Sequence, residues 1–432
     1  MDKNIDNAKK LLKNIYKSPN SYYTVSNIKE ILNEKKFIEL KFNESWKLEK
    51  GKNYYFVEND SSIFIFKVGK NCENLKNGIK IIAAHTDSPG LKIKPHHVIE
   101  SSKKQYKLNV EVYGGPILNT WFDRPLSISG RVIIKNDNKL ESKLVDLKKP
   151  MFIIPNLAIH LENKDKNVNP QIDLQPIFPM ENTKENENME SYVLELIASN
   201  LKLKKENIVD FDLYLYEYGE GTFIGENNEY ISSSRLDNLE SVYGALEGFL
   251  QTDTETNTNI LAFFDNEEIG SNTKEGANSS TLKYIIERIY FNFSENHDDY
   301  YIMLSNSILI SADGAHAYHP NYSEKYDPIN RSYLNEGVSL KYNSNKRYTT
   351  DSYTASIIKE ICNKNQIKLQ NYVNRSDQRG GSTLGPYLSA NLMIKSVDLG
   401  VPMLAMHSIR ELSGTKDYTY FIKLIKYFLD NF

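Results

Sequence analysis

Residues 79–90 read IKIIAAHTDSPG, and the apolar run from Ile79 to Ala84 ends at His85. A short apolar run of this kind is typical of a strand covered on both faces, as in the parallel sheet of an α/β protein. Ligands of such sheets gather at the carboxyl ends of the strands, where His85 lies. The stretch therefore predicts a buried strand that presents an imidazole to a binding site.

The same pattern occurs three more times along the chain. Each further run ends at a residue able to bind a metal: 260–264 before Asp265, 308–312 before Asp313, and 403–406 before His407. Segments with helical periodicity lie between or after them, beginning near Asp237 and covering 352–365 and 417–429. Strands that alternate with helices predict a three-layer α/β/α core, with Asp237 at or near a helix N-cap.

Residues 91–228 follow a different pattern. Strand-like stretches, interrupted by Gly, Pro and Asn, occur at 107–113, 126–134 and 212–216. A chain of 432 residues is also long for one ordinary core. We therefore expect an α/β domain made of 1–90 plus 229–432, with a β-rich domain of 91–228 inserted in it.

Composition excludes several classes of protein. The net charge of −3, from 53 basic and 56 acidic side chains, gives no field that would attract nucleic acid or an anionic membrane. The two cysteines, Cys72 and Cys362, are too few for a disulfide framework or a thiolate metal site, and Cys362 fits the core face of a helix. The first 20 residues lack the apolar stretch of a signal peptide. These features predict a cytoplasmic protein.

Five candidate metal ligands come from five separate motifs. They are His85, Asp237, Glu268, Asp313 and His407. Zinc favours imidazole nitrogen and carboxylate oxygen when thiolates are absent. Two such ions a few ångström apart can supply a nucleophile and stabilise an oxyanion, which peptide hydrolysis requires.

Other chemistries lack their motifs. No GxSxG elbow of a serine hydrolase and no GxxxxGK[ST] phosphate loop occurs in the sequence. Three further histidines, His96, His97 and His297, lie among polar and charged residues, and we expect them to face solvent.

The five candidate ligands lie in the motifs HTDSPG (85–90), SRLDN (234–238), DNEEIGS (265–271), ADGAHAYHP (312–320) and AMHSIREL (405–412). In this order, the motifs resemble those of the aspartyl aminopeptidase family, which includes cocatalytic zinc peptidases of the yeast vacuolar aminopeptidase I type. YGGPILNTWFDRPL (113–126) and LAIHL (157–161) also match, so the likeness covers nearly the whole chain.

The resemblance implies a role for each ligand. His85 and Asp313 would bind one zinc, Glu268 and His407 the other, with Asp237 bridging both and Glu267 as the general base. Asp87 is two residues after His85, so on an extended chain both side chains point the same way. That spacing suits a carboxylate that orients His85 or tunes the base.

Four further residues are candidates for substrate binding. In the family, the histidine equivalent to His160 reaches a neighbouring subunit's active site; a zinc ligand and a buried structural residue are the alternatives. Acid-preferring members carry a lysine at the position of Lys341, which would pair with an acidic substrate side chain; a solvated lysine on a strand edge is the alternative. His316 and His319 would line the pocket or pack locally in their loop.

The implied function is removal of N-terminal residues, with acidic Asp or Glu as a possible preference, by a zinc metallo-aminopeptidase. The resemblance also implies peptide substrates and a dodecamer built from dimers, with the insertion as the dimerisation domain. Another dinuclear zinc hydrolase, such as a carboxypeptidase or N-deacylase, is compatible with the same ligands. A non-catalytic binding protein is the third hypothesis, against which the intact Glu267 argues.

Overall fold

The computed structural model describes residues 2–70, 75–102, 105–161, 167–179, 189–253 and 257–431, so Cys72 lies outside the described residues. The chain forms two compact units. The first comprises Met1–Asp87, Gly221–Met406 and Glu411–Phe432, and the second comprises Ser88–Glu220 and His407–Arg410. Within the described ranges, no helix combines the length and the apolar character needed to cross a membrane.

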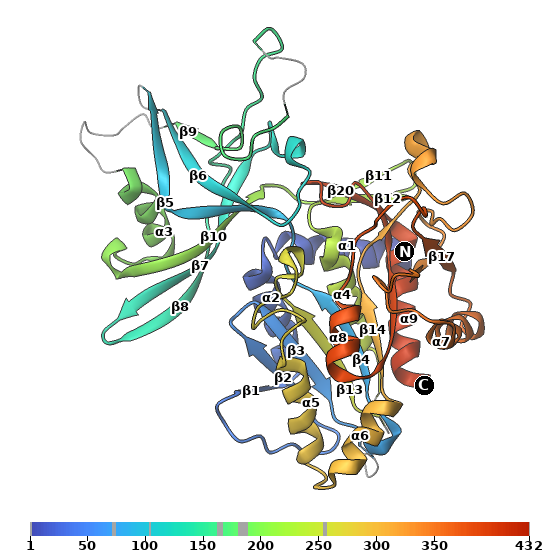
Figure 1. Ribbon diagram of the computed structural model, residues 1–432. Helices are drawn as coiled ribbons and strands as arrows, with labels where there is room; N and C mark the ends of the chain where they lie inside the picture. Colours follow the sequence, from blue (N-terminus) through green and yellow to red (C-terminus); the bar gives the residue numbers. More distant parts are fainter. Residues whose placement is uncertain are drawn as a thin grey trace. The chain divides into compact units, whose positions relative to one another are not determined.

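The first unit is built on a nine-stranded mixed sheet (Figure 1). Its strands in spatial order are β1 (Ile38–Leu40), β2 (Asn53–Glu58), β3 (Ser62–Lys67), β13 (Asn259–Phe264), β4 (Lys80–His85), β14 (Ile308–Ala312), β18 (Lys395–Gly400), β16 (Val338–Tyr342) and β17 (Leu369–Val373). The central strands β13, β4, β14 and β18 are parallel to one another. The buried strands expected around 79–84, 260–264 and 308–312 are therefore confirmed.

Helices cover both faces of this sheet. One face carries α1 (Lys3–Tyr16), α2 (Ser21–Glu34), α4 (Leu236–Leu250), α7 (Ser352–Lys364) and α9 (Thr415–Asn431), and the other carries α5 (Thr281–Phe291), α6 (His297–Asn306) and α8 (Gly385–Leu392). Ile82 and Ala84 of β4 belong to the core of the first face, whereas Ile81 and Ala83 belong to that of the second. This alternation gives the expected three layers.

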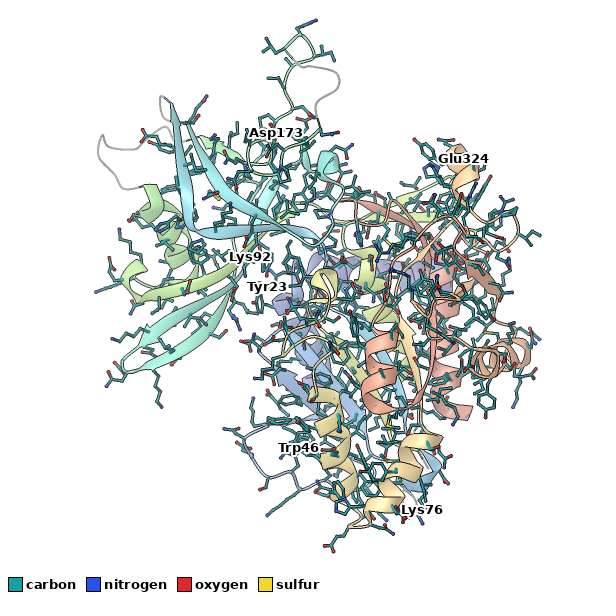
Figure 2. All side chains as sticks on the ribbon, viewed as in Figure 1. Tyr23, Trp46, Lys76, Lys92, Asp173 and Glu324 are labelled. Carbon is teal, nitrogen blue, oxygen red and sulfur yellow. The ribbon has the colours of Figure 1, made fainter. Side chains whose placement is uncertain are left out.

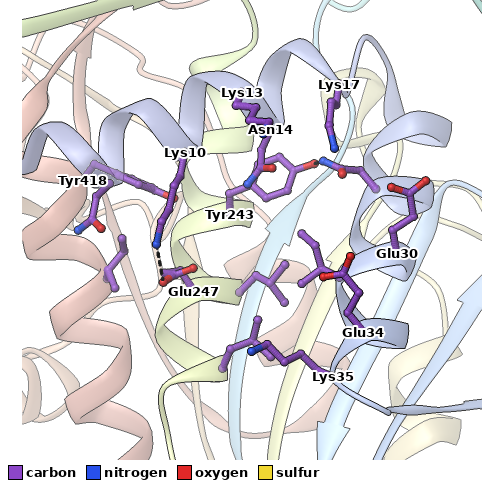
Figure 3. Close-up of a pocket in the computed structure, with 16 residues that line it drawn as sticks. Lys10, Lys13, Asn14, Lys17, Glu30, Glu34, Lys35, Tyr243, Glu247 and Tyr418 are labelled. Atoms are coloured by element: carbon purple, nitrogen blue, oxygen red, sulfur yellow. Dashed lines mark hydrogen bonds and ion pairs between the residues drawn. The ribbon is translucent and has the colours of Figure 1, made fainter. Parts of the chain in front are cut away.

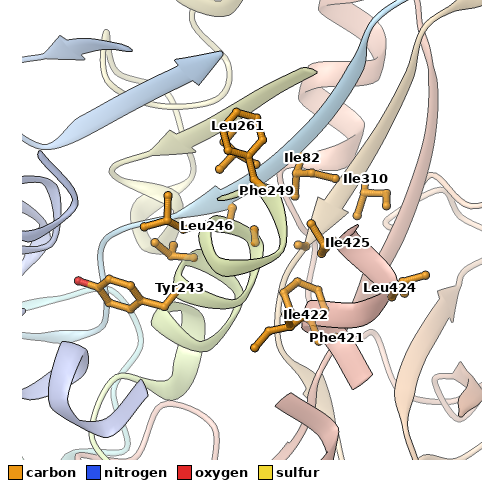
Figure 4. Close-up of a cluster of buried hydrophobic side chains, with 14 of the residues drawn as sticks. Ile82, Tyr243, Leu246, Phe249, Leu261, Ile310, Phe421, Ile422, Leu424 and Ile425 are labelled. Atoms are coloured by element: carbon orange, nitrogen blue, oxygen red, sulfur yellow. The ribbon is translucent and has the colours of Figure 1, made fainter. Parts of the chain in front are cut away.

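Helices α4 and α9 pack closely against each other in the larger core (Figure 4). A Cβ added to Gly244 would lie 2.5 Å from Phe421 Cδ1, and one added to Gly248 would lie 2.9 Å from the Ile422 carbonyl oxygen. Glycine at these two positions lets the helices approach closely. Phe249 and Phe421 are fully buried there, and truncating either to Ala would cost about 3–5 kcal/mol of unfolding free energy.

Aromatic rings fill part of the second core. Trp46, labelled in Figure 2, stacks on Phe66 with ring centroids 6.1 Å apart. The Arg288 guanidinium of α5 lies 4.0 Å from the Trp46 ring and donates to the Phe42 carbonyl oxygen at 2.9 Å. Cys362, on α7 in the larger core, is 2 % exposed, as its position on an apolar helix face predicts.

A five-stranded sheet completes the first unit and corrects one expectation. Its order is β11 (Thr222–Ile224), β12 (Tyr230–Ser233), β20 (Glu411–Gly414), β19 (Pro402–Leu404) and β15 (Ala315–His316). The apolar run 403–406 was expected to form a strand of the central parallel sheet and to end at His407. Instead β19 lies in this smaller sheet, antiparallel to β20, and ends at Leu404. Ala405 and His407 both have positive φ, so the chain turns before the histidine.

The second unit is a six-stranded sheet with one long helix among its described residues. The strands in order are β8 (Lys139–Asp146), β7 (Leu126–Asn136), β10 (Ile208–Glu217), β5 (Gly90–Ser102), β6 (Gln105–Tyr113) and β9 (Ile177–Pro179), and the helix is α3 (Met189–Leu201). The strands expected at 107–113, 126–134 and 212–216 are confirmed. His97 was expected to face solvent, but it is 2 % exposed and its ring meets Phe211 edge-on at 5.4 Å.

Candidate metal centre

The site lies at the carboxyl ends of three neighbouring parallel strands in the first unit. His85 ends β4 and pairs in register with Phe264 at the end of β13, while Ser311 of β14 pairs with Ala83. Asp313 follows β14 by one residue, and the turn that holds Glu267 and Glu268 follows β13. The sheet register therefore brings these side chains to the same edge.

The turn after β13 is fixed by Asp87. Asn266 adopts φ 63°, which starts the short 3₁₀ turn η4 (Glu267–Ile269). The Asp87 carboxylate accepts hydrogen bonds from the backbone N–H of Glu267 at 3.2 Å and from that of Glu268 at 3.1 Å. Its Oδ1 also lies 3.4 Å from His85 Nδ1. Asp87, which is 3 % exposed, thus holds the turn and the imidazole in one arrangement.

Asp237 occupies an irregular start of α4. Its backbone is not helical, the Asp237–Asn238 peptide is cis, and Arg235 rather than Asp237 holds the N-cap position. The Asp237 N–H donates to Glu411 Oε2 at 2.9 Å, and Asn238 Nδ2 donates to the Ala312 carbonyl oxygen at 2.8 Å. The first bond attaches the start of α4 to the start of β20, and the second attaches it to the end of β14.

The side chains form a compact donor set. Ligand atoms of His85, Asp237 and Asp313 lie within 4.8 Å of one another, and so do those of His85, Glu267 and Glu268. His85 Nε2 lies 3.5 Å from Asp237 Oδ1 and 3.9 Å from Asp313 Oδ1. Asp265, which also follows a strand, belongs to neither group and is buried beside Asp87.

Negative charge dominates this region. Burial alone would lower the pKa of His85, but hydrogen bonds to Asp237, Asp313 and Asp87 raise it well above the usual value. Burial and the like charges of Asp313, Asp87 and Asp237 raise the pKa of Glu267 to about 8, although His85 opposes the shift. In the metal-free chain protons therefore offset part of the carboxylate charge. A dication would take over that task, and nitrogen and carboxylate oxygen are donors that zinc accepts.

Lys341 is part of this environment and is not a solvated lysine on a strand edge, so that alternative is wrong. It is 2 % exposed, and β16 has β17 and β18 on its two sides. Lys341 Nζ donates to the carbonyl oxygens of Asp313 and Gly314, both at 2.9 Å, and lies 3.9 Å from Asp313 Oδ2. The ammonium thus fixes the backbone that carries one candidate ligand.

The two histidines of the following loop have different surroundings. His316 is partly buried, meets Tyr372 edge-on at 6.2 Å, and lines a cavity of about 260 Å³ together with Lys325 and Arg375. His319 caps η5 (Pro320–Lys325), because its Nδ1 accepts the backbone N–H of Asn321 at 3.2 Å. His319 therefore makes local loop contacts, whereas His316 faces a cavity.

Two candidates belong to the second unit. His160 is exposed, so the alternative of a buried structural histidine is wrong. His407 begins the segment His407–Arg410, and its Nδ1 lies 3.0 Å from the Gly115 carbonyl oxygen. That contact leaves Nε2 as the ring atom with capacity for a ligand.

Two residues that position the site were missed by sequence reasoning. Glu411 holds the Asp237 backbone, and Asn238 joins α4 to β14. Both lie inside quoted motifs: Asn238 directly follows Asp237 in SRLDN, and Glu411 is four residues after His407 in AMHSIREL. A polar residue in the same motif as a candidate ligand was the available signal, but only the fold shows which backbone group it reaches.

Comparison with known proteins agrees with this geometry. Residues 14–429 match the family model of aminopeptidase I zinc metalloproteases, M18. The probable M18 family aminopeptidase 2 of Clostridium novyi is 50% identical over 433 residues, covering 99% of each chain. The structure of the Ape4 and Nbr1 complex matches with a TM-score of 0.95 at 35% identity, covering 99% of this chain and 86% of that one. The S. cerevisiae mApe1 dodecamer matches with a TM-score of 0.86 at 27% identity, covering 98% and 95%. The chain belongs to the M18 family of zinc aminopeptidases, which remove N-terminal residues.

Proposed function

We propose that this aminopeptidase works through two zinc ions per subunit bridged by Asp237. His85 and Asp313 would hold one ion, and Glu268 and His407 the other. The observation that carries the proposal is the convergence of His85, Asp237 and Asp313 within 4.8 Å at the sheet edge. His407 is included because it follows directly after Met406, which belongs to the first unit. Bound zinc supplies a Lewis acid for the peptide carbonyl and lowers the pKa of water.

Glu267 is the general base in this mechanism. Its carboxylate accepts a proton from the attacking water and then donates it to the leaving amine. The geometry supports this role, since ligand atoms of Glu267 lie within 4.8 Å of those of His85 and Glu268. Asp87 acts as a positioning residue, since it holds the backbone N–H groups of Glu267 and Glu268.

Anomalous scattering at the zinc edge, combined with product analysis, tests the centre and the reaction together. We expect two anomalous peaks per chain, one of them between His85 and Asp313. With a tripeptide series, the N-terminal residue should appear before any other product. A single peak would contradict the bridging role of Asp237, and initial release of the C-terminal residue would favour the carboxypeptidase alternative.

The substrate preference is a second proposal, that Lys341 favours acidic N-terminal residues. Lys341 is the buried cation beside Asp313, and an ion pair gains most where water is excluded. Its ammonium already donates to two carbonyl oxygens, so one N–H remains for a substrate carboxylate. Charge complementarity at this position supports Asp or Glu as the residue removed.

A panel of aminoacyl fluorogenic substrates on wild type and Lys341→Met separates preference from structure. We expect wild type to prefer Asp and Glu, and the variant to lose that preference while it keeps neutral-substrate turnover. Lys368→Met, on an exposed lysine just before β17, is the matched control and should change nothing. Equal loss on all substrates would make Lys341 a positioning residue for Asp313, and faster cleavage of Leu than Asp by wild type would refute the acidic preference.

Assembly is a third proposal: a dodecamer built from dimers, in which His160 reaches the active site of a neighbouring subunit. The segment around His160 exposes Leu157, Ile159 and Leu161, with exposed fractions of 55%, 66% and 72%. Three large apolar side chains exposed within five residues are typical of a protein contact. The S. cerevisiae relative is a dodecamer, which supports the stoichiometry.

Co-expression of two inactive chains tests the exchange of His160. Oligomers that mix His160→Ala chains with Glu267→Gln chains should regain activity, because an intact base and an intact histidine then meet at some sites. Neither variant alone should be active. His96→Ala, an exposed histidine of the same unit, is the control and should keep full activity. No recovery in verified mixed oligomers would place His160 in its own subunit's site, and an active monomer would refute the assembly.

The location in the cell is proposed as cytoplasmic, with peptides as substrates and neither nucleic acid nor membrane as partner. The near balance of 53 basic and 56 acidic side chains and the presence of only two cysteines support this. Cell fractionation with an antibody against the chain is the direct test, and recovery in the culture medium would contradict the proposal.

A further inference from the structure

A cavity of the first unit lies among α1, α2, α4 and α9 (Figure 3). Its volume is about 420 Å³, which is within the range of small-ligand sites. The floor is apolar and is made by Tyr243, Leu246 and Leu250 of α4 with Ile31 and Ile422. Glu247 of α4, which also lines the cavity, is ten residues beyond Asp237, or roughly 15 Å along a helix, so this is a second location.

Lysines of α1 border one side of the pocket. Lys10, Lys13 and Lys17 are spaced at three and four residues, so they form one stripe along the helix. Lys10 has a carboxylate partner, Glu247 at 3.9 Å. Lys13 and Lys17 have no ion pair or hydrogen bond from their ammonium groups to any part of the chain that the structure describes. Two neighbouring cations therefore face the pocket uncompensated.

Glutamates of α2 border another side. Glu30 and Glu34 are four residues apart on the same helix face, and both line the pocket. Their carboxylates make no ion pair or hydrogen bond within the described ranges, although lysines border the same cavity. In Figure 3, Lys13 and Lys17 lie above the Tyr243 ring, whereas Glu34 and Lys35 lie below it. The pocket thus keeps the lysines of one helix and the glutamates of another more than an ion-pair distance apart, with Lys35 next to Glu34.

The floor between the stripes is rigid. Tyr243 is 2 % exposed, and its hydroxyl is bonded to Ser18 Oγ at 2.5 Å and to Asn27 Nδ2 at 2.9 Å. These bonds fix the ring beside Leu246. A ligand that enters consequently meets a preformed apolar surface and needs little ordering of the protein.

We propose that this pocket binds a short peptide with apolar side chains. The peptide's terminal carboxylate would meet Lys13 and Lys17, its terminal ammonium would meet Glu30 and Glu34, and its side chains would cover the floor. A ligand with one charge of each sign matches both stripes. A polyanion such as phosphate matches only part of the lining, because it would be attracted by Lys10, Lys13, Lys17 and Lys35 but repelled by Glu30, Glu34 and Glu247. Short peptides are the substrates and products of an aminopeptidase, so they are present wherever the enzyme acts.

Calorimetry with a trileucine analogue, in which a hydroxyethylene group replaces the first peptide bond and prevents hydrolysis, tests the site on the zinc-loaded enzyme. We expect two binding events per chain, one at the metal centre and one at this pocket. Lys13→Glu with Lys17→Glu, and separately Glu30→Gln with Glu34→Gln, should weaken the second event about tenfold or more, because charge-assisted hydrogen bonds are lost. Lys9→Glu, on the same helix but outside the pocket, should leave it unchanged.

Capping the analogue distinguishes charge recognition from apolar burial. Acetylation of its N-terminus and amidation of its C-terminus should each weaken the pocket event. The proposal is overturned if neither pair of substitutions weakens any binding event seen in wild type, whether or not the analogue also binds at the metal centre. Tight binding of inorganic phosphate that displaces the peptide would identify an anion site instead.

Discussion

Strand β4 begins at Lys80 and ends at His85, and the buried charges at its two ends are neutralised by different means. At the first end, Lys80 Nζ donates to the Leu429 carbonyl oxygen at 2.9 Å, near the end of α9. The neighbouring Lys67 donates to the carbonyl oxygens of Phe249 and Thr252, both at 2.8 Å, where α4 ends. At the second end, carboxylates gather around one imidazole.

The difference shows which end of the sheet depends on an external ligand. The last carbonyl groups of a helix lack intrahelical partners and carry partial negative charge, so a buried lysine there completes the fold. Carboxylates brought together repel one another, and among the described residues Lys341 is the buried cation that meets Asp313. At the lysine end, the buried charges are balanced by groups of the chain itself. The carboxylate end is stabilised most by a bound metal ion.

We expect the largest effect at the carboxylate end from Glu267→Gln. The amide cannot accept a proton, so turnover should fall by about two to four decades while both metals stay bound. Glu275→Gln, in the same loop but outside the candidate ligand groups, is the matched control. Steady-state kinetics with metal analysis measures both quantities, and near-normal turnover would remove Glu267 from the mechanism.

Asp237→Ala should empty the metal centre. Because Asp237 is proposed to bridge, its loss should lower the zinc content toward zero rather than toward one ion per chain. A stability effect should follow, since a ligand present at 100 times its Kd contributes about 2.7 kcal/mol to the folded state. Asp253→Ala, beyond the other end of α4, should keep both ions. Two zinc ions in the Asp237 variant would exclude a bridging role.

Lys67→Met should destabilise the opposite end of the sheet. The substitution leaves the Phe249 and Thr252 carbonyl oxygens without their buried donor, which should cost about 1–3 kcal/mol of unfolding free energy. Lys70→Met, on a more exposed lysine close by, is the control. Urea unfolding measures the difference. Unchanged stability would mean that water satisfies these carbonyl groups.

The difference in stability between wild type and Lys67→Met should also depend on pH. Burial lowers the pKa of Lys67 to about 8, against 10.5 as the ordinary value, and Asp253 and Asp430 only partly oppose the shift. Between these two values the unfolded chain binds more protons, so stability should rise with pH in this window. The free energy of unfolding of wild type should therefore increase relative to that of Lys67→Met between pH 8 and 10.5. A difference that is flat with pH would place the pKa of Lys67 at its ordinary value.

Sequence patterns predict the parallel core well, for a physical reason. Strands such as β4 and β13 are buried on both faces, so their apolar runs are unbroken and end where the site begins. The candidate ligands His85 and Asp313 could be placed at one edge because parallel strands share a direction. The contacts of Asp87 with the turn after β13 required the register of that turn.

Other features could not be read from local patterns. The strand β19 has the same apolar character as β4, but its partners β15 and β20 are far away in the sequence and place it in another sheet. Burial of His97 and Lys341 depends on partners supplied by distant strands, such as Phe211 for His97. A polar residue flanked by charges is normally exposed, and only tertiary contacts reverse that expectation.

The division of the chain between its two units also sets the order in which they can be finished during synthesis. The second unit is made almost wholly from Ser88–Glu220, yet its core includes Ile409, which is 5 % exposed. The core of the first unit includes α9, which ends at Asn431. Neither core is complete until residues 409–431 have been synthesised. A product truncated before residue 403 would thus leave two unfinished cores rather than one finished domain.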